Sequence, residues 1–384
     1  MKTAVLVSGG VDSSVALRLL LDRGHDVTAF YLKIWLEDER ANLGDCPWDE
    51  DLRYVRAVCD PLGVPVEVVP LQREYHQRVV EDAIRELRAG RTPSPDILCN
   101  RRVKFGAFFE FLETNAMPFD AVATGHYARV EDLGEHRTLL KAVDPKKDQT
   151  YFLHRLTQDQ LARSRFPLGS LHKAEVRALA KSFGLATYER PDSQGICFLG
   201  TLPYDDFVRA YLGEAPGEIR HLESGRLLGT HRGCWFFTIG QRRGLGLGGG
   251  PWFVVAKNIE DNLVWVTHRE SLDAHGRTHF DLVHCHWIGS PPVWGDALEV
   301  KLRHGPRTQS ATLTRLDESV RVDLTEPDPG IAAGQSAVVY DGERCLGGGL
   351  ITLPTACLST SRKSELIEHD VDHHAGHRYI EPNG

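Results

Sequence analysis

The sequence TAVLVSGGVDSS, residues 3–14, decides the fold of the first part of this chain. Residues 3–7 have the apolar, β-branched character of a buried strand, and from Asp12 onward apolar residues recur at helical spacing. Gly9 and Gly10 lie in the turn between strand and helix, where backbone N–H groups can approach a ligand with no Cβ in the way. The helix that follows adds the partial positive charge of its N-terminus, so we expect this turn to bind a phosphate.

The side chains around the turn limit which phosphate site it forms. No lysine follows the glycines, so the turn is not a Walker A loop. Asp12 would either hold Mg²⁺ or cap the helix, and a simple helix N-cap turn is the alternative interpretation of the whole stretch. The glycine-rich residues 244–249 have the spacing of a dinucleotide-binding loop, but Pro251 and a strand-like run follow them. Because the required helix is missing from that context, we interpret them as an ordinary loop.

Outward from the turn, strands and helices alternate. Strand-like runs occupy residues 3–7, 27–32, 66–69 and 121–124, with helical patterns between them. The alternation predicts an α/β fold, in which residues 1–200 form a domain around a doubly wound parallel sheet. Ligands of such sheets bind at the carboxyl ends of the strands.

Two smaller domains are expected after the sheet. Residues 201–278 begin with a helical pattern and then contain strand-like runs at 234–238 and 252–255, which indicates a small central domain. In residues 279–356 short strands are separated by turn signals, a pattern that predicts a C-terminal antiparallel β-barrel. Residues 357–384 have little apolar content and four histidines, so we expect a disordered tail, with a weak metal-binding tract as the alternative.

Composition and cysteine content narrow the class of protein. The chain has 384 residues, a net charge of −8 and eight cysteines, with no CxxC pair to form a local zinc site. No apolar run approaches the roughly 20 residues that cross a bilayer, and the N-terminus has no leader pattern. We therefore expect a cytoplasmic protein with free thiols and no membrane partner. The acidic residues 37–51 have no assignable role, and His284 and His286 are expected on one side of a strand.

Two cysteines lie in stretches that carry other chemical signals. Cys99 follows Asp96 and comes just before a basic stretch that begins at Arg101 and before a helix, so we expect it to be prone to ionise. Asp96 is a candidate acid or base if the turn brings it close. Cys197 lies in DSQGICF, residues 192–198, where the glycine indicates a tight backbone. For each cysteine taken alone, a buried structural thiol is the alternative.

Seven segments together resemble the bacterial tRNA-specific 2-thiouridylases, members of the N-type ATP pyrophosphatase superfamily with its adenine nucleotide alpha hydrolase-like fold. The segments, in order between residues 8 and 351, are SGGVDSS, GRTPSPDILCNRRVKF, ATGHYAR, KDQTYFL, DSQGICF, TIGQRRGLGLGG and GQSAVVYDGERCLGGGLI. The combination of SGGVDS with DILCN and GICF is highly specific among enzymes with this pyrophosphatase loop.

The resemblance implies a tRNA sulfurtransferase that adenylates the C2 oxygen of the wobble uridine and then delivers persulfide sulfur, releasing AMP and pyrophosphate. Its implied partners are ATP with Mg²⁺, a tRNA with a wobble uridine, and a persulfide sulfur-carrier protein. Cys197 would carry the persulfide, and Cys99, with Asp96 nearby, would close a transient disulfide with it. The implied ATP contacts are Leu6, Val7, Ser8, Gly9, Gly10, Val11, Asp12, Ser13, Leu32 and Gly125. The implied tRNA contacts are Ser94, Pro95, Asp96, His126, Lys147, Asp148, Gln149, Arg303, His304 and Gln335.

The reaction chemistry agrees with this set of residues. The C2 oxygen of uracil is a poor leaving group, and adenylation converts it into a phosphate ester that leaves readily. A persulfide is a soft nucleophile, and a second thiol is needed to break its S–S bond and leave sulfur on the ring. The base must also leave its stack to reach these groups.

Two other classes of function remain open. An amide-forming ligase would use the same loop with an amine nucleophile, and its activity should survive alkylation of the cysteines. A catalytically silent tRNA-binding protein would release neither AMP nor pyrophosphate when tRNA is present.

Overall fold

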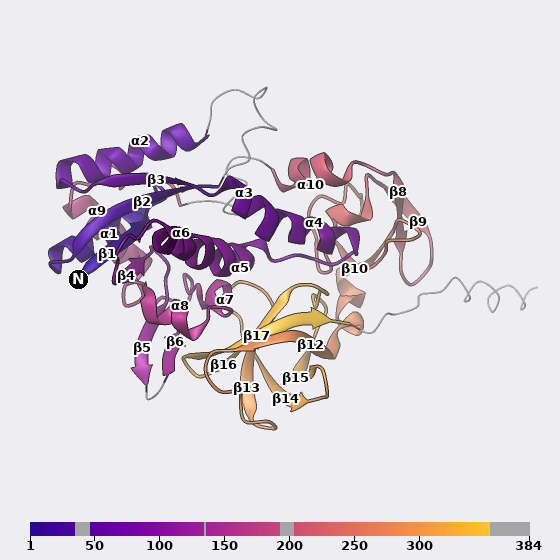
Figure 1. The fold of residues 1–384 in the computed structure, drawn as a ribbon. Coiled ribbons are helices and arrows are strands. Elements are labelled where there is room, and N and C mark those ends of the chain that lie inside the picture. Colours follow the sequence, from indigo (N-terminus) through magenta and orange to yellow (C-terminus); the bar gives the residue numbers. More distant parts are fainter. Residues whose placement is uncertain (35–46, 134–135, 193–202, 354–384) are drawn as a thin grey trace, which may run out of the picture. The chain divides into compact units, whose positions relative to one another are not determined.

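A five-stranded parallel sheet forms the core of the first part of the chain (Figure 1). The computed structural model describes residues 1–34, 47–133, 136–192 and 203–353. The strands pair in the order β3-β2-β1-β4-β7 and are β1 (Lys2–Leu6), β2 (Asp26–Lys33), β3 (Val66–Pro70), β4 (Ala121–Ala123) and β7 (Ser164–Arg165). Strands β2 and β4 pair with β1 on opposite sides, so the strand order reverses at β1. The predicted doubly wound sheet is confirmed, and the end of β1 lies at the switch point where such sheets bind ligands.

Helices cover both faces of this sheet. They are α1 (Val11–Asp22), α2 (Pro47–Cys59), α3 (Gln72–Tyr75), α4 (Glu81–Arg88), α5 (Pro95–Cys99), α6 (Phe108–Thr114), α7 (Thr150–Leu153), α8 (Gln158–Arg163) and α9 (Lys173–Ser182), with the 3₁₀ turn η1 (Asp60–Leu62) and the π-helical segments η2 (His76–Val80) and η3 (Asn100–Ala107). Val5 of β1 belongs to a buried cluster with Leu17 of α1 and Val55 of α2. The next residue, Leu6, belongs to the cluster that contains Phe108 of α6. Burial on both faces explains why the strand is apolar throughout and does not alternate.

A four-stranded mixed sheet follows in the sequence. After helix α10 (Tyr204–Leu212), this region contains β8 (Gly217–His221), β9 (Leu227–His231), β10 (Trp252–Asn258) and β11 (Leu263–His268), paired in the order β10-β11-β8-β9, and the 3₁₀ segments η4 (Cys234–Phe236) and η5 (Arg269–His275). The prediction of a strand at residues 234–238 is wrong. Gly233, with a φ of +148°, turns the chain into η4, and the consecutive residues Phe236 and Phe237 are both buried. The apolar run therefore fills a compact turn.

Six antiparallel strands close into a C-terminal barrel (Figure 1). They are β12 (Arg277–Trp287), β13 (Ala297–Lys301), β14 (Gln309–Arg315), β15 (Val320–Asp328), β16 (Ser336–Asp341) and β17 (Arg344–Thr352), and pairing of β12 with β17 closes the barrel. The hairpin β5 (Arg129–Leu133) and β6 (His136–Leu140), from the first part of the chain, extends the same sheet where Leu140 pairs with Arg344. The predicted barrel is confirmed, and it is joined to the first part of the chain by the pairing of β17 with β6.

A bulge in β12 changes the predicted placement of His284 and His286. The pairing of β12 with β17 shifts register between Val283 and His286, and His284 has a φ of +50°. This bulge leaves His284 exposed, whereas the ring of His286 lies 2.9 Å from the carbonyl oxygen of Leu156. The expectation that His284 and His286 share one side of the strand is wrong, because an inserted residue breaks the period of two.

Several predicted features lie outside the described residues. They are Cys197, the greater part of the acidic stretch 37–51, and residues 357–384. Among the helices that are described, none is long and apolar enough to cross a bilayer.

Candidate functional site

The turn after β1 is held by its own serines. The backbone N–H of Ser8 donates to Oγ of Ser13 (3.2 Å), and the Ser13 hydroxyl donates to the carbonyl of Gly10 (3.1 Å). Gly10 is the N-cap of α1 and has an extended backbone, with φ −85° and ψ 163°. The first N–H groups of α1 therefore have no partner within the helix and are directed out of its end. This is the backbone geometry of an anion site at a helix N-terminus.

Two glycines let other segments approach this turn closely. A Cβ on Gly9, whose φ is +73°, would lie 2.7 Å from Nη1 of Arg190. A Cβ on Gly125, which follows β4, would lie 2.7 Å from the backbone nitrogen of Ser13. Val7 continues the β1 ladder by donating its N–H to the carbonyl of Phe30 in β2 (2.9 Å). The structure thus brings the predicted ATP contacts in the turn together with Gly125 at one end of the sheet.

Two basic side chains contact the turn from distant parts of the sequence. Arg190 donates to the carbonyl of Gly9 (2.8 Å) and to the carboxylate of Asp51 (2.5 Å). Burial raises the pKa of Asp51, and the hydrogen bond from Arg190 opposes that rise. Lys173, at the start of α9, places Nζ 2.7 and 2.8 Å from the two carboxylate oxygens of Asp12. The turn is therefore bordered by cations that the sequence motif itself does not contain.

A tyrosine and a second aspartate complete this arrangement. The hydroxyl of Tyr127 donates to Asp12 (2.8 Å), and burial, together with the Asp12 charge, raises the pKa of Tyr127, so the hydroxyl stays protonated as a donor. Asp192 lies 2.9 Å from Nζ of Lys173 and accepts from Lys147 at 2.7 Å. Burial works to raise the pKa of Asp192, but the hydrogen bonds from Lys147 and Lys173 hold it well below its usual value.

Cys99 lies inside a long helical segment. Helix α5, η3 and α6 follow one another without a break from Pro95 to Thr114, and Cys99 is the last residue of α5. The expectation that Cys99 precedes the helix is therefore wrong, because proline, with its fixed φ, suits the first helical position and starts the segment earlier. Cys99 is 1% exposed, and its neighbour Asn100 donates to the carbonyl of Phe152 in α7 (3.2 Å). Because Cys197 lies outside the described residues, its pairing with Cys99 stays a prediction.

Helix α7 lies between the Cys99 segment and the barrel. The hydroxyl of Tyr151 donates to the carbonyl of Ser336 in β16 (2.9 Å). Burial raises the pKa of Tyr151, while the charge of Arg303 and a hydrogen bond with Ser94 oppose the rise. The ring of His304 lies 4.5 Å from that of Phe152, measured between centroids. Predicted tRNA contacts from the catalytic part and from the barrel therefore meet around α7.

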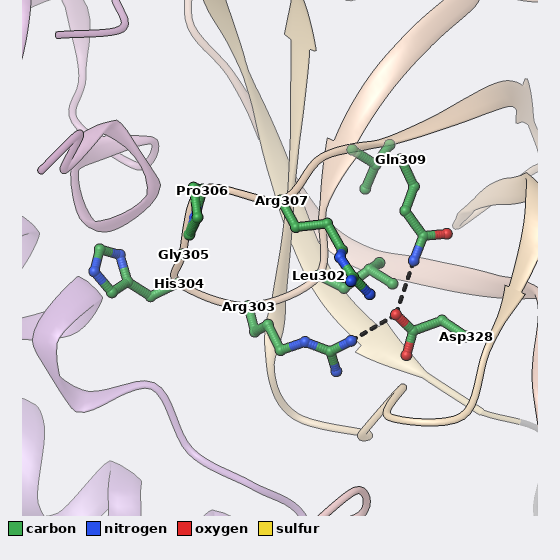
Figure 2. A pocket seen from close by; sticks show the side chains of 9 residues that line it. Leu302, Arg303, His304, Gly305, Pro306, Arg307, Gln309 and Asp328 are labelled. Atoms are coloured by element: carbon green, nitrogen blue, oxygen red, sulfur yellow. Dashed lines mark hydrogen bonds and ion pairs between the residues drawn. The ribbon is translucent and has the colours of Figure 1, made fainter. Parts of the chain in front are cut away.

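The barrel loop that carries Arg303 and His304 borders a small cavity of about 180 Å³ (Figure 2). Arg303 is held by Asp328 (2.5 Å), whose carboxylate also accepts from Gln309 (2.8 Å). Figure 2 shows the ring of His304 turned away from these side chains. Burial lowers the pKa of His304, and the nearby carboxylates, Asp96 among them, oppose this. The two predicted contacts thus face different surroundings.

Residues 147–149 connect the turn with the barrel. Lys147 binds Asp192 beside the turn, as described above. Asp148 is buried and pairs with Lys301 of β13 at 2.6 Å. The side-chain oxygen of Gln149 accepts from the backbone N–H of Tyr127 (2.9 Å). Three consecutive predicted tRNA contacts therefore bind protein groups in this structure.

The last two predicted tRNA contacts are His126 and Gln335. Nδ1 of His126 lies 2.7 Å from the hydroxyl of Thr124, and burial holds the pKa of His126 well below its usual value. Gln335 directly precedes β16. Two residues before it, the carbonyl of Ala333 accepts from the backbone N–H of Thr92 (2.8 Å), which brings this part of the barrel beside the segment that leads to Ser94.

Sequence reasoning missed four residues of the site, namely Tyr127, Lys173, Arg190 and Asp192. Lys173 and Asp12 are 161 positions apart, and Arg190 and Gly9 are 181 apart. No local pattern links such pairs, because Lys173 reaches the turn through the packing of α9 beside α1, and Arg190 reaches it from the chain that follows α9. The one available signal was that two of the four lie in quoted segments, Tyr127 in ATGHYAR and Asp192 in DSQGICF.

Comparisons with known proteins cover nearly the whole chain. Three family profiles match, namely the tRNA methyl transferase HUP domain at residues 1–201, the tRNA methyl transferase PRC-barrel domain at 205–268 and the aminomethyltransferase beta-barrel domain at 277–351. The tRNA-specific 2-thiouridylase MnmA 2 of Bacteroides fragilis is 44% identical over 357 residues, which cover 91% of this chain and 100% of that protein. The tRNA-specific 2-thiouridylase MnmA of Shewanella putrefaciens is 44% identical over 91% of this chain and 95% of its own. A solved 4-thiouridine synthetase–RNA complex with bound ATP covers 52% of this chain and 45% of its own at 20% identity, with a TM-score of 0.31, too low to inform the site.

Proposed function

The chain belongs to the tRNA-specific 2-thiouridylase family, and we propose that it uses ATP to replace the C2 oxygen of the wobble uridine in tRNA by sulfur. The observation that carries this proposal is the extent of the similarity. Identity of 44% extends over 91% of this chain and 100% of a relative named as a 2-thiouridylase. The similarity is therefore not confined to a shared nucleotide-binding domain, which alone would leave the reaction open.

ATP is proposed to bind at the turn from Leu6 to Ser13, with Leu32 and Gly125 completing the site. The N–H groups at the start of α1 suit the phosphates, and the close contact of Gly125 with Ser13 leaves no room for a larger residue. Asp12 is the residue that would hold Mg²⁺. It offers hard carboxylate oxygens at the helix end, and one or two carboxylates suffice for magnesium that is also bound to phosphates. When bound, Mg²⁺ would neutralise charge on the departing pyrophosphate.

Sulfur transfer is assigned to the two predicted cysteines. The terminal sulfur of a Cys197 persulfide attacks C2 of the adenylated uridine, and AMP leaves with the former C2 oxygen. The Cys99 thiolate then attacks the inner sulfur of Cys197, so that a disulfide forms and the outer sulfur stays on the ring as 2-thiouridine. An external thiol reductant restores both thiols, and a persulfide carrier protein reloads Cys197. Asp96, three residues before Cys99, is proposed to act as an acid or base beside them.

The tRNA is proposed to lie along the surface where the catalytic part of the chain meets the barrel. Ser94, Pro95 and Asp96 would surround the target base, while His126, residues 147–149, Arg303, His304 and Gln335 would contact the rest of the substrate. The meeting of several of these residues around α7 supports this path. We also propose domain boundaries at residues 200, 278 and 356, and action in the cytoplasm.

The proposal is tested by digesting tRNA to nucleosides after incubation with the protein. The tRNA must come from cells that lack the modification, and the reaction contains ATP, Mg²⁺ and a persulfide source. We expect a 2-thiouridine peak that requires all of these components, and we expect Cys99→Ser to reduce it by about a thousandfold or more because the nucleophile is lost. The matched control is Cys59→Ala, which alters a buried cysteine of α2 that has no assigned role.

Other outcomes have distinct meanings. A thiolated product with Cys99→Ser at the wild-type rate would refute the cysteine assignment. Release of AMP and pyrophosphate with no thiolated nucleoside would instead favour an adenylating ligase. No release of either product in the presence of tRNA would favour a protein that only binds tRNA.

A further inference from the structure

Lys173 occupies a position that the proposed reaction does not yet explain. Its backbone N–H donates to Asp144 (3.0 Å), which fixes the start of α9. Its Nζ lies within 2.9 Å of three carboxylate oxygens, two from Asp12 and one from Asp192, and its side chain is 14% exposed. A lysine side chain is seldom buried to this degree unless it is paired, so this position carries a specific interaction.

Asp192 gathers three cations from separate elements. Lys147 and Lys173 bind it at 2.7 and 2.9 Å, and Arg177, one turn along α9, binds it at 2.5 Å. Asp192 is only partly buried, with 26% of its side chain exposed. Three positive side chains thus share one accessible carboxylate next to Asp12, the first-turn acid of the phosphate-binding helix.

The phosphate-binding turn lacks a cation of its own. In a Walker A loop a lysine of the loop reaches the outer phosphates, and no such lysine follows Gly9 and Gly10. The outer phosphates of ATP carry most of its negative charge, and charge-assisted hydrogen bonds from lysine or arginine are the usual compensation. A cation from elsewhere in the fold can supply this compensation at the end of α1, and Lys173 contacts the carboxylate of Asp12 in the first turn of that helix.

We propose that Lys173 binds the outer phosphates of ATP and the pyrophosphate that leaves, and that Asp192 is a positioning residue that holds Lys173 until phosphate displaces it. Lys173 also neutralises Asp12 while no divalent ion is bound there, and frees that carboxylate when it turns to the phosphates. This inference rests on the proposed function, because it assumes that ATP binds at the turn.

Removing the charge of Lys173 and removing the charge of Asp192 should change the affinity for the nucleotide in opposite directions. If Asp192 competes with phosphate for Lys173, removing the Asp192 charge makes Lys173 more available and strengthens nucleotide binding. If Asp192 and Lys173 only stabilise the fold, Asp192→Asn weakens binding or leaves it unchanged. The sign of the effect of Asp192→Asn therefore separates the two roles.

The experiment measures binding to the full chain by titration calorimetry in the presence of Mg²⁺. The ligand is an ATP analogue with a methylene bridge between the α- and β-phosphates, which cannot release pyrophosphate, and AMP is the comparison ligand. We expect Lys173→Met to weaken binding of the analogue by about tenfold, Lys173→Arg to recover part of the loss, and Asp192→Asn to tighten binding about threefold. AMP affinity should change less than about twofold, because AMP lacks the outer phosphates.

The controls separate this inference from the proposal on which it rests. Lys181→Met, an exposed lysine near the end of the same helix, should bind the analogue as the wild type does. Wild-type protein that fails to bind the analogue would contradict the proposed ATP site itself. If the wild type binds the analogue, an affinity that is unchanged in Lys173→Met, or that is unchanged or weaker in Asp192→Asn, would overturn the inference alone. If Lys173→Met does not fold, the direction in which Asp192→Asn changes the affinity for the analogue still tests the inference.

Discussion

Two regions of this molecule are built around lysine–aspartate pairs, and they differ in their exposure to water. At the turn after β1, Lys173 is paired with Asp12 and Asp192, whose side chains are 32% and 26% exposed. Where the catalytic part meets the barrel, Lys301 pairs with Asp148, and both side chains are at most 3% exposed. The first region shares its cations among several carboxylates, whereas the second holds one cation on one carboxylate.

The difference shows which pairs can exchange partners. A partly exposed carboxylate can be replaced by a phosphate, because water solvates it once it is released. A buried pair cannot separate in the same way, since each charge would remain without a partner in a medium of low polarity. The turn therefore has the properties of a ligand site, and the Lys301–Asp148 pair those of a permanent connection.

Breaking the buried pair should have the largest effect on stability. Lys301→Met leaves the Asp148 charge buried without its partner and should lower the free energy of unfolding by about 3–5 kcal/mol. Lys173→Met at the turn should lower it by only about 1 kcal/mol, because Asp192 keeps Lys147 and Arg177, Asp12 keeps the Tyr127 hydroxyl, and both carboxylates are partly solvated. Denaturant unfolding of the two variants measures both values.

The double variant Asp148→Leu with Lys301→Met serves as the control for this prediction. It removes both charges and should recover most of the stability lost in Lys301→Met. Equal losses for Lys301→Met and Lys173→Met would mean that the two regions do not differ as described.

A smaller effect should appear in the pH dependence at α7. Burial, with the charges of Arg155 and His286, lowers the pKa of His154 from 6.5 to about 3, and its Nε2 has no hydrogen-bond partner among the described residues. Between these two values the unfolded chain binds a proton that the folded protein does not, so this contribution to stability is complete above pH 6.5 and is lost as the pH falls toward 3. At about pH 5 the loss should be near 2 kcal/mol.

His154→Phe isolates this contribution. The variant removes the titrating group and should lose about 2 kcal/mol less than the wild type between about pH 7.5 and pH 5. Unfolding free energies at the two pH values provide the measurement. Identical pH profiles for wild type and variant would show that His154 binds its proton at the same pH in the folded protein and in the unfolded chain.

The sequence predicted those parts of the fold that local patterns determine. The strand, turn and helix around Ser8–Ser14, the doubly wound sheet and the barrel all followed from apolar periodicity and turn residues. Residues 234–238 were misassigned because a run of apolar residues suits a buried turn as well as a strand. The extension of the barrel sheet by β5 and β6 was not predicted, because pairing between strands some 200 residues apart leaves no local pattern.

The candidate site was also predicted only in part, because some of its residues come from distant parts of the sequence. The turn and the Cys99 segment are continuous in sequence, so their residue types are visible there. Lys173 and Arg190 reach the turn only through the packing of distant elements. Asp148 illustrates a different difficulty: it belongs to a tRNA-contact segment by resemblance, yet its carboxylate is buried against Lys301. Sequence alone does not reveal which acidic side chains the fold buries.

If ATP bound at the turn after β1 adenylates the C2 oxygen of uridine, that oxygen must leave with AMP, and an isotope label can follow it. A tRNA is prepared with the heavy isotope of oxygen at C2 of the wobble uridine and incubated with the protein, ATP, Mg²⁺ and a persulfide source. Mass spectrometry then measures the released AMP. We expect the heavy oxygen to appear in the phosphate of AMP in proportion to the 2-thiouridine formed. Thiolated tRNA accompanied by AMP without the label would contradict it.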